Sequence, residues 1–163
     1  MKTRKKSERG QSLVELAISL LVLLYLLSGV VEFGIAFFQF IQLRDAAQEG
    51  ALYGSINPGV LSPIETRVRN ASDSPIDLSV TSGPQAVTVT VKAYDDATGN
   101  EIPNLADACV GDGIRVDVSF NHQIFMPFIS RLIGAHNNTP PNTIPLTGSV
   151  TDTILQSTAT GCS

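Results

Sequence analysis

The most prominent pattern along the chain is an apolar stretch near its beginning. Sixteen successive residues, 16–31, carry no charge, and no proline occurs before Pro58. An uninterrupted run of this kind predicts one long helix, which we expect over residues 11–54. Because a helix needs about 20 mostly apolar residues to cross a membrane, the pattern also predicts a membrane span at about residues 13–38.

The second part of this helix, about residues 36–54, is expected to be amphipathic. Apolar residues recur there at helical spacing on one side, namely Phe40, Leu43, Ala47 and Ala51. Charged and amide side chains fall mostly off that stripe. A membrane does not reach so far along the rod, so the stripe predicts contact with the remainder of the chain, residues 55–163.

Two short helices are predicted in that remainder. The first begins at Ser62, whose hydroxyl suits an N-cap, with Pro63 in the first turn and Glu65 completing a capping box. Its expected buried face consists of Ile64, Val68 and Ala71. The second is expected around residues 126–134, and its expected buried side chains are Phe128, Ile129 and Leu132.

Alternation of apolar and polar residues predicts four β-strands. Two of them, around residues 76–80 and 87–93, are separated by a Gly-Pro turn and predict a hairpin, and two more lie around 114–124 and 144–155. Such strands form a sheet with one apolar face that needs a cover, which the amphipathic part of the long helix provides. We therefore predict an α+β fold, in which a long N-terminal transmembrane and amphipathic helix packs on a small four-stranded antiparallel sheet with two short helices.

Charge is distributed unevenly along the chain. Residues 1–10 carry five basic residues and one acidic residue, which gives +4, so the remaining residues carry −8 because the total is −4. A basic segment before a span places that end in the cytoplasm. We therefore expect a single-pass protein of the cytoplasmic (inner) membrane with residues 55–163 outside the cytoplasm. Beyond residue 10 no broad cluster of cations occurs, which argues against nucleic-acid binding.

The two cysteines, Cys109 and Cys162, both fall in the part expected outside the cytoplasm, where disulfides form. If the strands at 114–124 and 144–155 pair antiparallel, both cysteines lie at the same end of the sheet. We therefore favour a disulfide between them over the alternative of two free thiols.

The sequence contains no pattern typical of a catalytic or metal site. His122 shares an apolar strand face with Phe120 and Ile124, which is typical of a core or edge histidine. The acidic residues between positions 95 and 112 do not have the spacing of a calcium-binding loop. We therefore predict no enzymatic activity, cofactor, metal or small-molecule substrate.

Glu15 is the unusual residue of the apolar helix, because a carboxylate in hydrocarbon costs on the order of 2–3 kcal/mol. Together with the preceding residues, Arg9-Gly10-Gln11-Ser12-Leu13-Val14, it resembles the processing site of type IV prepilins. The resemblance implies that residues 1–10 are a basic leader, which a prepilin peptidase removes by cutting between Gly10 and Gln11. It also implies that Glu15 pairs with the new N-terminal amine and sets the register between packed helices.

The wider segment, roughly residues 8–54, resembles the TadE-like minor pilins of tight-adherence (tad/Flp) pili. Three motifs carry the resemblance: RGxxxVE, EFG and AAxxGAxY. Their residues in this chain are Arg9, Gly10, Val14, Glu15, Glu32, Phe33, Gly34, Ala46, Ala47, Gly50, Ala51 and Tyr53. The resemblance implies a pilin-like fold and a role as a minor pilin or pilus-assembly component. Its implied partners are membrane lipid, a prepilin peptidase and other pilus subunits.

Two alternatives from other classes are open. One is an unprocessed, signal-anchored exported protein with a binding or sensory domain unrelated to pili. The other is an anchored exported hydrolase, which is disfavoured because the sequence shows no nucleophile–base motif. Cleavage after Gly10 separates the pilin from the first alternative, and an activity screen addresses the second.

Overall fold

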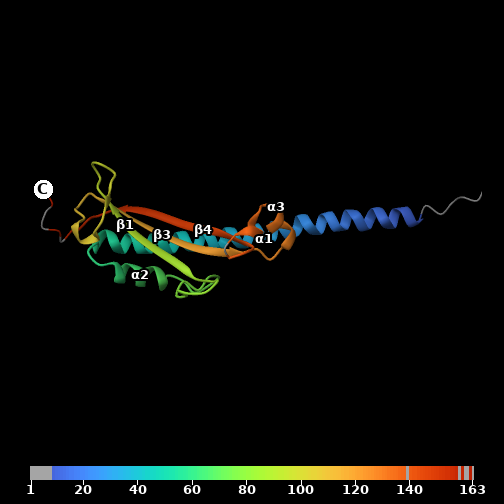
Figure 1. The fold of residues 1–163 in the computed structure, drawn as a ribbon, viewed down its shortest axis with the longest axis horizontal. Coiled ribbons are helices and arrows are strands. Elements are labelled where there is room, and N and C mark those ends of the chain that lie inside the picture. The colour runs from blue at the N-terminus through green and yellow to red at the C-terminus, as the bar shows by residue number, and fades with distance from the viewer. Residues whose placement is uncertain (1–8, 139, 158, 160–161, 163) are drawn as a thin grey trace, which may run out of the picture.

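One helix organises the structure. The computed structural model describes residues 9–138, 140–157, 159 and 162, so the predicted leader lies outside the described residues except for Arg9 and Gly10. Helix α1 (Arg9–Ile56) comprises 48 residues, which corresponds to a rod of roughly 72 Å at about 1.5 Å per residue. Figure 1 shows that its N-terminal part extends well beyond the other elements. The predicted long helix is confirmed.

The other elements pack against the C-terminal half of α1. A four-stranded antiparallel sheet has the order β2-β1-β3-β4, and its strands are β1 (Val87–Tyr94), β2 (Glu101–Ile102), β3 (Gly113–Gln123) and β4 (Thr143–Thr153). The short helices are α2 (Leu61–Arg69) and α3 (Pro127–Leu132), with single 3₁₀ turns η1 (Leu105–Asp107) and η2 (Ala135–Asn137). Helix α2 lies alongside α1, and α3 lies where the projecting part of α1 begins (Figure 1). The predicted α+β fold class is confirmed.

The core lies between α1 and one face of the sheet. Side chains alternate along a strand, and the alternate residues Ile114, Val116 and Val118 of β3 are fully buried. Ala93 of β1 lies opposite Ile114 in the pairing register and is also buried. Because full burial of an aliphatic side chain contributes about 1.5–3 kcal/mol, this face is a main source of stability.

The other face of the sheet is polar. Arg115 on β3 donates hydrogen bonds to Asp117 at 2.9 Å and to Ser149 on β4 at 3.0 Å. Lys92 donates to Glu101 at 2.7 Å, and this hydrogen bond raises the pKa of Lys92. Exposed pairs of this kind add little stability, so the sheet depends on its contact with the helices.

The predicted strand at 76–80 is wrong, although two of its apolar residues, Ile76 and Leu78, are buried. The Gln42 amide on α1 donates to the Ile76 carbonyl at 2.7 Å and accepts from its N–H at 2.9 Å. Arg69 donates to the Leu78 carbonyl at 3.1 Å. Side chains thus bond the backbone groups that a neighbouring strand would have paired. The fourth strand is instead β2, which lies in the acidic stretch between positions 95 and 112, where no strand was predicted.

Two details of α2 also differ from the prediction. The helix begins at Leu61, and its N-cap is Val60 without a capping side chain, so Ser62 is not the cap. Ile64 and Val68 are buried as predicted, but Ala71 lies beyond the helix and is exposed. The turn after the helix therefore begins earlier than the apolar pattern indicates.

The residues predicted to form the buried faces of α3 and α1 also differ in part from those that the structure buries. Leu132 is 75% exposed and Ile129 is half-buried, while the side chain of Phe128 is outside the described set. On α1, Phe40 is 37% exposed, because the buried side passes through Gln42 and Leu43. Because the polar residue Gln42 belongs to the buried side of α1, the centre of that side lies away from Phe40.

Candidate functional site

The N-terminal part of α1 is exposed and extends beyond the rest of the fold (Figure 1). Every residue from Gly10 to Leu27 is exposed, and we call this segment the free half of α1. Helix α1 contains a stretch that is long and apolar enough to cross a membrane, and none of that stretch is buried. Among the described residues, α1 is the one helix that is long and apolar enough to cross a membrane. The free half is thus suited to membrane anchoring.

The predicted processing site lies at the beginning of the free half. A side chain built at Gly10 meets no atom of another described element within 4 Å. Glu15 is exposed on a shallow face that it shares with Gln11, Val14 and Ile18. Within the described part of the chain, Glu15 has no ion pair or side-chain hydrogen bond. Both the predicted cleavage point and this carboxylate are therefore open to another molecule.

Glu32 makes the polar contact that fastens the sheet to α1. Its Oε1 accepts from His122 Nε2 at 3.0 Å and from the Phe125 backbone N–H at 3.1 Å. The second ring nitrogen of His122, Nδ1, lies 2.6 Å from Gln39 Oε1. Gln39 follows Glu32 by about two helical turns, so both side chains leave α1 on the same side. We call Glu32, Gln39 and His122 the Glu32 clamp.

The Glu32 clamp is shielded from water. The His122 side chain is 2% exposed and that of Glu32 is 12% exposed. A carboxylate at such a site is costly without donors, and here it has two. A protonated imidazole donates to both partners, whereas a neutral one donates to Glu32 and accepts from a rotated Gln39 amide. In either form the clamp holds the end of β3 on α1, which confirms His122 as a satisfied core histidine.

Further along α1, small residues allow the sheet and α2 to approach closely. The small-residue seam consists of Ala46, Ala47, Gly50, Ala51 and Gly54, all of which are buried. A side chain built at Gly50 would overlap Val68 Cγ2 of α2, and one at Gly54 would lie 2.6 Å from Ile114 Cδ1 of β3. Real Cβ atoms essentially never come within 3.0 Å of such neighbours. The seam thus gives the AAxxGAxY motif a packing role.

A second close approach occurs where β4 crosses α1. A side chain built at Gly148 would lie 2.5 Å from both the Arg44 nitrogen and the Leu43 carbonyl carbon. These are backbone atoms, which cannot move aside as a flexible side chain can. This contact was not predicted from the sequence, although an isolated glycine within a strand pattern is a known sign of close backbone approach.

The other motif residues divide between the two sides of α1. Tyr53 packs against the core, and the Arg67 guanidinium lies 5.3 Å from its ring centroid in a cation–π contact. Phe33 points the other way, is 72% exposed, and stacks on Phe37 with the ring centroids 6.1 Å apart. Gly34 has open space around it. Exposed apolar side chains recur at helical spacing on this side, which we call the outer apolar face: Val30, Phe33, Phe37 and Ile41.

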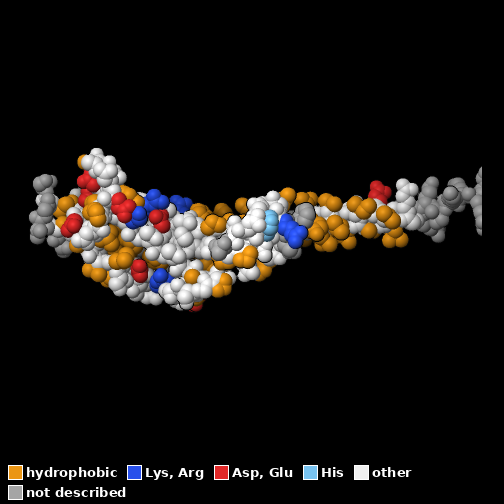
Figure 2. Space-filling model, viewed as in Figure 1, with side chains coloured by type: hydrophobic (Ala, Val, Ile, Leu, Met, Phe, Trp, Pro, Cys, Tyr) orange, Lys and Arg blue, Asp and Glu red, His pale blue; other side chains and the backbone are white. Residues whose placement is uncertain are grey.

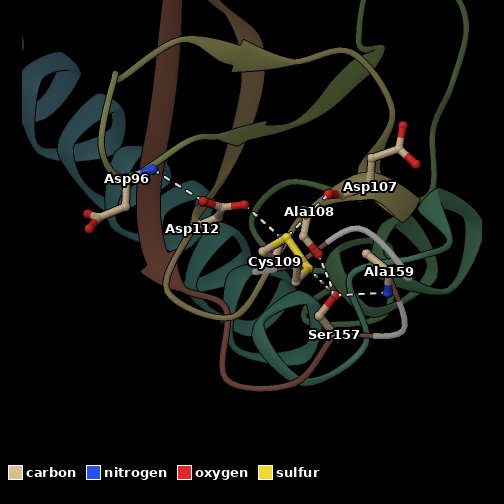
Figure 3. Close-up of a disulfide and its surroundings, with 8 residues drawn as sticks. Asp96, Asp107, Ala108, Cys109, Asp112, Ser157 and Ala159 are labelled. Carbon is tan, nitrogen blue, oxygen red and sulfur yellow. Dashed lines mark hydrogen bonds between the residues drawn. A yellow bond between two sulfur atoms is a disulfide. The ribbon is translucent and has the colours of Figure 1, made fainter.

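The cysteines lie at the far end of the sheet from the free half. Cys109 and Cys162 form a disulfide, and their Cα atoms are 5.5 Å apart. Figure 3 shows Asp112 beside it, accepting from the Cys109 N–H at 2.7 Å and the Asp96 N–H at 3.2 Å. The disulfide links the segment before β3 to the segment after β4. We find no role for it in the surfaces of α1 described above.

These features define a helix-anchored α+β protein in which half of the anchor helix is covered by its own domain. The family model for TadE-like protein matches residues 10–52, so this segment of α1 is similar to the TadE-like family. The match lies wholly within α1. It includes Glu32 and most of the small-residue seam but no part of the sheet. Comparisons with curated proteins and with solved structures give no significant match.

Proposed function

We propose that this chain is a minor pilin or pilus-assembly component of a tad/Flp-type pilus. The free half of α1 holds it in the cytoplasmic (inner) membrane, with the α+β unit outside the cytoplasm, and a prepilin peptidase cuts it after Gly10. The observation that supports the proposal is that one half of α1 is covered by the domain and the other half is exposed. The TadE-like segment has one half covered by its own domain and one free apolar half that begins with Gly10 and Glu15.

Glu15 is the polar group that cleavage brings into use. A cut after Gly10 leaves the amine of Gln11 four residues before Glu15, and residues at this spacing lie on the same side of a helix. Glu15 therefore pairs with its own amine or with that of a neighbouring subunit. Two opposite charges about 4 Å apart attract by only about 1 kcal/mol in bulk water and far more in apolar surroundings. Such a pair offsets the cost of a carboxylate in lipid and gives adjacent helices a common register.

The outer apolar face supports association with other subunits. Phe33 follows Glu15 by 18 residues, or about five complete turns, so both lie on the same side of α1. The face is exposed although it lies beside the domain. Contiguous exposed apolar surface of this kind is typical of interaction sites. The proposed activity is therefore binding to pilus components, without turnover of a substrate.

The experiment that tests this function is the intact mass of the protein extracted from its own host's membrane. We expect a chain that begins at Gln11. Gly10→Leu should retain the leader, because the peptidase needs a residue without a side chain at the cut. Gly34→Leu is the matched control, since it adds the same side chain at another open glycine of α1, and it should be processed like the wild type.

The other outcomes point to other functions. A full-length wild-type chain would favour the unprocessed, signal-anchored binding or sensory protein. A cut beyond Phe38 would indicate a secreted domain and reject the membrane anchor. Normal processing of Gly10→Leu would reject the peptidase as the enzyme responsible.

A further inference from the structure

The domain meets the free half of α1 at a defined depth. Near the end of the free half, a side chain built at Gly29 would come 3.9 Å from Ile129 Cδ1 of α3. From Gln11 to Ser28 the helix rises about 27 Å, and the hydrocarbon core of a bilayer is about 30 Å thick. If the free half spans the membrane, as proposed above, then α3 and its neighbours lie at the outer surface of the bilayer.

We call residues 124–137 the collar, because Figure 1 shows them at the end of the domain where α1 leaves it. Among its described side chains, the collar exposes three large apolar ones: Phe125 at 73%, Leu132 at 75% and Ile133 at 53%. Its other side is packed, since Ile124, Ser130 and Ala135 are buried. The exposed side chains therefore extend from a fixed framework on the side of the domain nearest the predicted membrane.

Charge separates the collar from the opposite end of the domain. From Val118 to Thr151 the sequence contains no aspartate or glutamate, whereas Arg131 and His136 of the collar are exposed. The carboxylate that reaches the collar is that of Glu32, which the clamp already engages. Acidic side chains gather mainly at the far end, and a basic side chain lies where the free helix begins (Figure 2). The collar thus suits a negatively charged, apolar surface.

We propose that the collar docks on the outer leaflet of an anionic phospholipid bilayer. Phe125, Leu132 and Ile133 enter the interface, and Arg131 contacts the headgroups. Aromatic and aliphatic side chains bind interfaces in this way when a basic residue accompanies them. The contact fixes the depth and tilt of the domain while the protein is held in the membrane. This proposal rests on the proposed membrane span of the free half of α1.

The chain contains no tryptophan, so a single introduced tryptophan is a unique fluorescent probe of depth. Full-length Phe125→Trp and Leu132→Trp are reconstituted in vesicles of phosphatidylethanolamine and phosphatidylglycerol. Some vesicles carry lipids brominated near the headgroup, and others carry lipids brominated near the chain end. Leu20→Trp reports the proposed span, and Leu155→Trp, at an exposed site outside the collar, is the aqueous control.

We expect at least a twofold loss of collar fluorescence from the bromines near the headgroup and a smaller loss from those near the chain end. Leu20→Trp should show stronger quenching by the deep bromines, and Leu155→Trp should show none. If Leu20→Trp is not quenched, the membrane span itself fails. If it is quenched while both collar probes are not, the span stands and the collar proposal is overturned.

Two further measurements separate the lipid from other sources of shielding. One outcome is that the tryptophan emission of the collar probes is blue-shifted without bromine quenching, and that the blue shift disappears when the protein is diluted in lipid. This result would mean that a second copy of the protein covers the collar, and it would overturn the proposal. Arg131→Glu in the Leu132→Trp background should reduce quenching in phosphatidylglycerol vesicles but not in phosphatidylcholine vesicles. If the Leu132→Trp protein with and without Arg131→Glu were quenched equally in both kinds of vesicle, the contact of Arg131 with the headgroups would be rejected.

Discussion

The two halves of α1 both present apolar side chains, yet they meet different surroundings. The free half is rich in leucine, and its residues from Gly10 to Leu27 are all exposed. The covered half places alanine and glycine at its contact with the sheet, in the small-residue seam. Large, flexible aliphatic side chains suit a fluid lipid environment, whereas small ones allow a folded backbone to approach closely. Side-chain size along the helix therefore indicates whether lipid or protein covers it.

The two glutamates of α1 differ in the same way. Glu32 is engaged by a histidine side chain and a backbone N–H of its own domain. Glu15 is exposed, and among the described residues it has no such partner. A carboxylate in apolar surroundings requires a donor, and the donor for Glu32 is supplied by folding. In the proposed function the donor for Glu15 is the new N-terminal amine of the same or a neighbouring subunit, which is why we propose that Glu15 acts in assembly.

The largest expected effect tests whether the covered half depends on close contact between backbones. Gly148→Ala should lower the free energy of unfolding by about 3 kcal/mol or more, because its Cβ meets two backbone atoms of α1 that cannot move aside. The measurement is urea unfolding of the full-length protein in a mild detergent, followed by circular dichroism. Gly113→Ala is the control, because its nearest neighbour would lie at an ordinary 3.5 Å. If Gly148→Ala and Gly113→Ala lowered the free energy of unfolding equally, the close approach of β4 to the backbone of α1 at Gly148 would be contradicted.

A smaller effect distinguishes the two glutamates. Glu32→Gln keeps the shape but removes the charge, and hydrogen bonds to charged groups contribute about 1–2 kcal/mol more than neutral ones. We expect the free energy of unfolding to fall by that amount. Glu15→Gln should leave the unfolding curve unchanged but reduce piliation in the host, as counted by electron microscopy. Normal piliation in Glu15→Gln would remove the proposed pairing with the N-terminal amine.

Much of the fold was predictable because it follows from local periodicity. The long helix and the strands β1, β3 and β4 each repeat their apolar positions over many residues. The segment at 76–80 shows the limit of this approach. Its alternation correctly indicated that Ile76 and Leu78 are buried, but not that Gln42, 34 residues away from Ile76, would bond the backbone. Periodicity reports which side of a segment is buried and is silent about what pairs with its backbone.

The surfaces of α1 were predictable as motifs but not as contacts. The EFG and AAxxGAxY motifs identified Glu32 and Gly50 from sequence alone. Their partners are remote, since His122 follows Glu32 by 90 residues, and no local pattern contains such a pair. Gln39 could have been found, because it is a polar residue in phase with Glu32 on one side of the helix. Its bond to a histidine requires the folded structure.

The smallest expected effect tests side-chain size within the helix itself. Gly50→Ala adds a methyl group that overlaps Val68 Cγ2, and valine is stiff about χ1. Overpacking costs about 1–3 kcal/mol, and the gain in helix propensity returns up to about 1 kcal/mol, so we expect a net loss of about 1 kcal/mol in unfolding free energy. Gly34→Ala, in open space on the same helix, has no overlap to offset that gain, so it should raise the unfolding free energy by up to about 1 kcal/mol. If both substitutions stabilised the protein, the seam would be loose, and residue size would not distinguish the covered half from the free half.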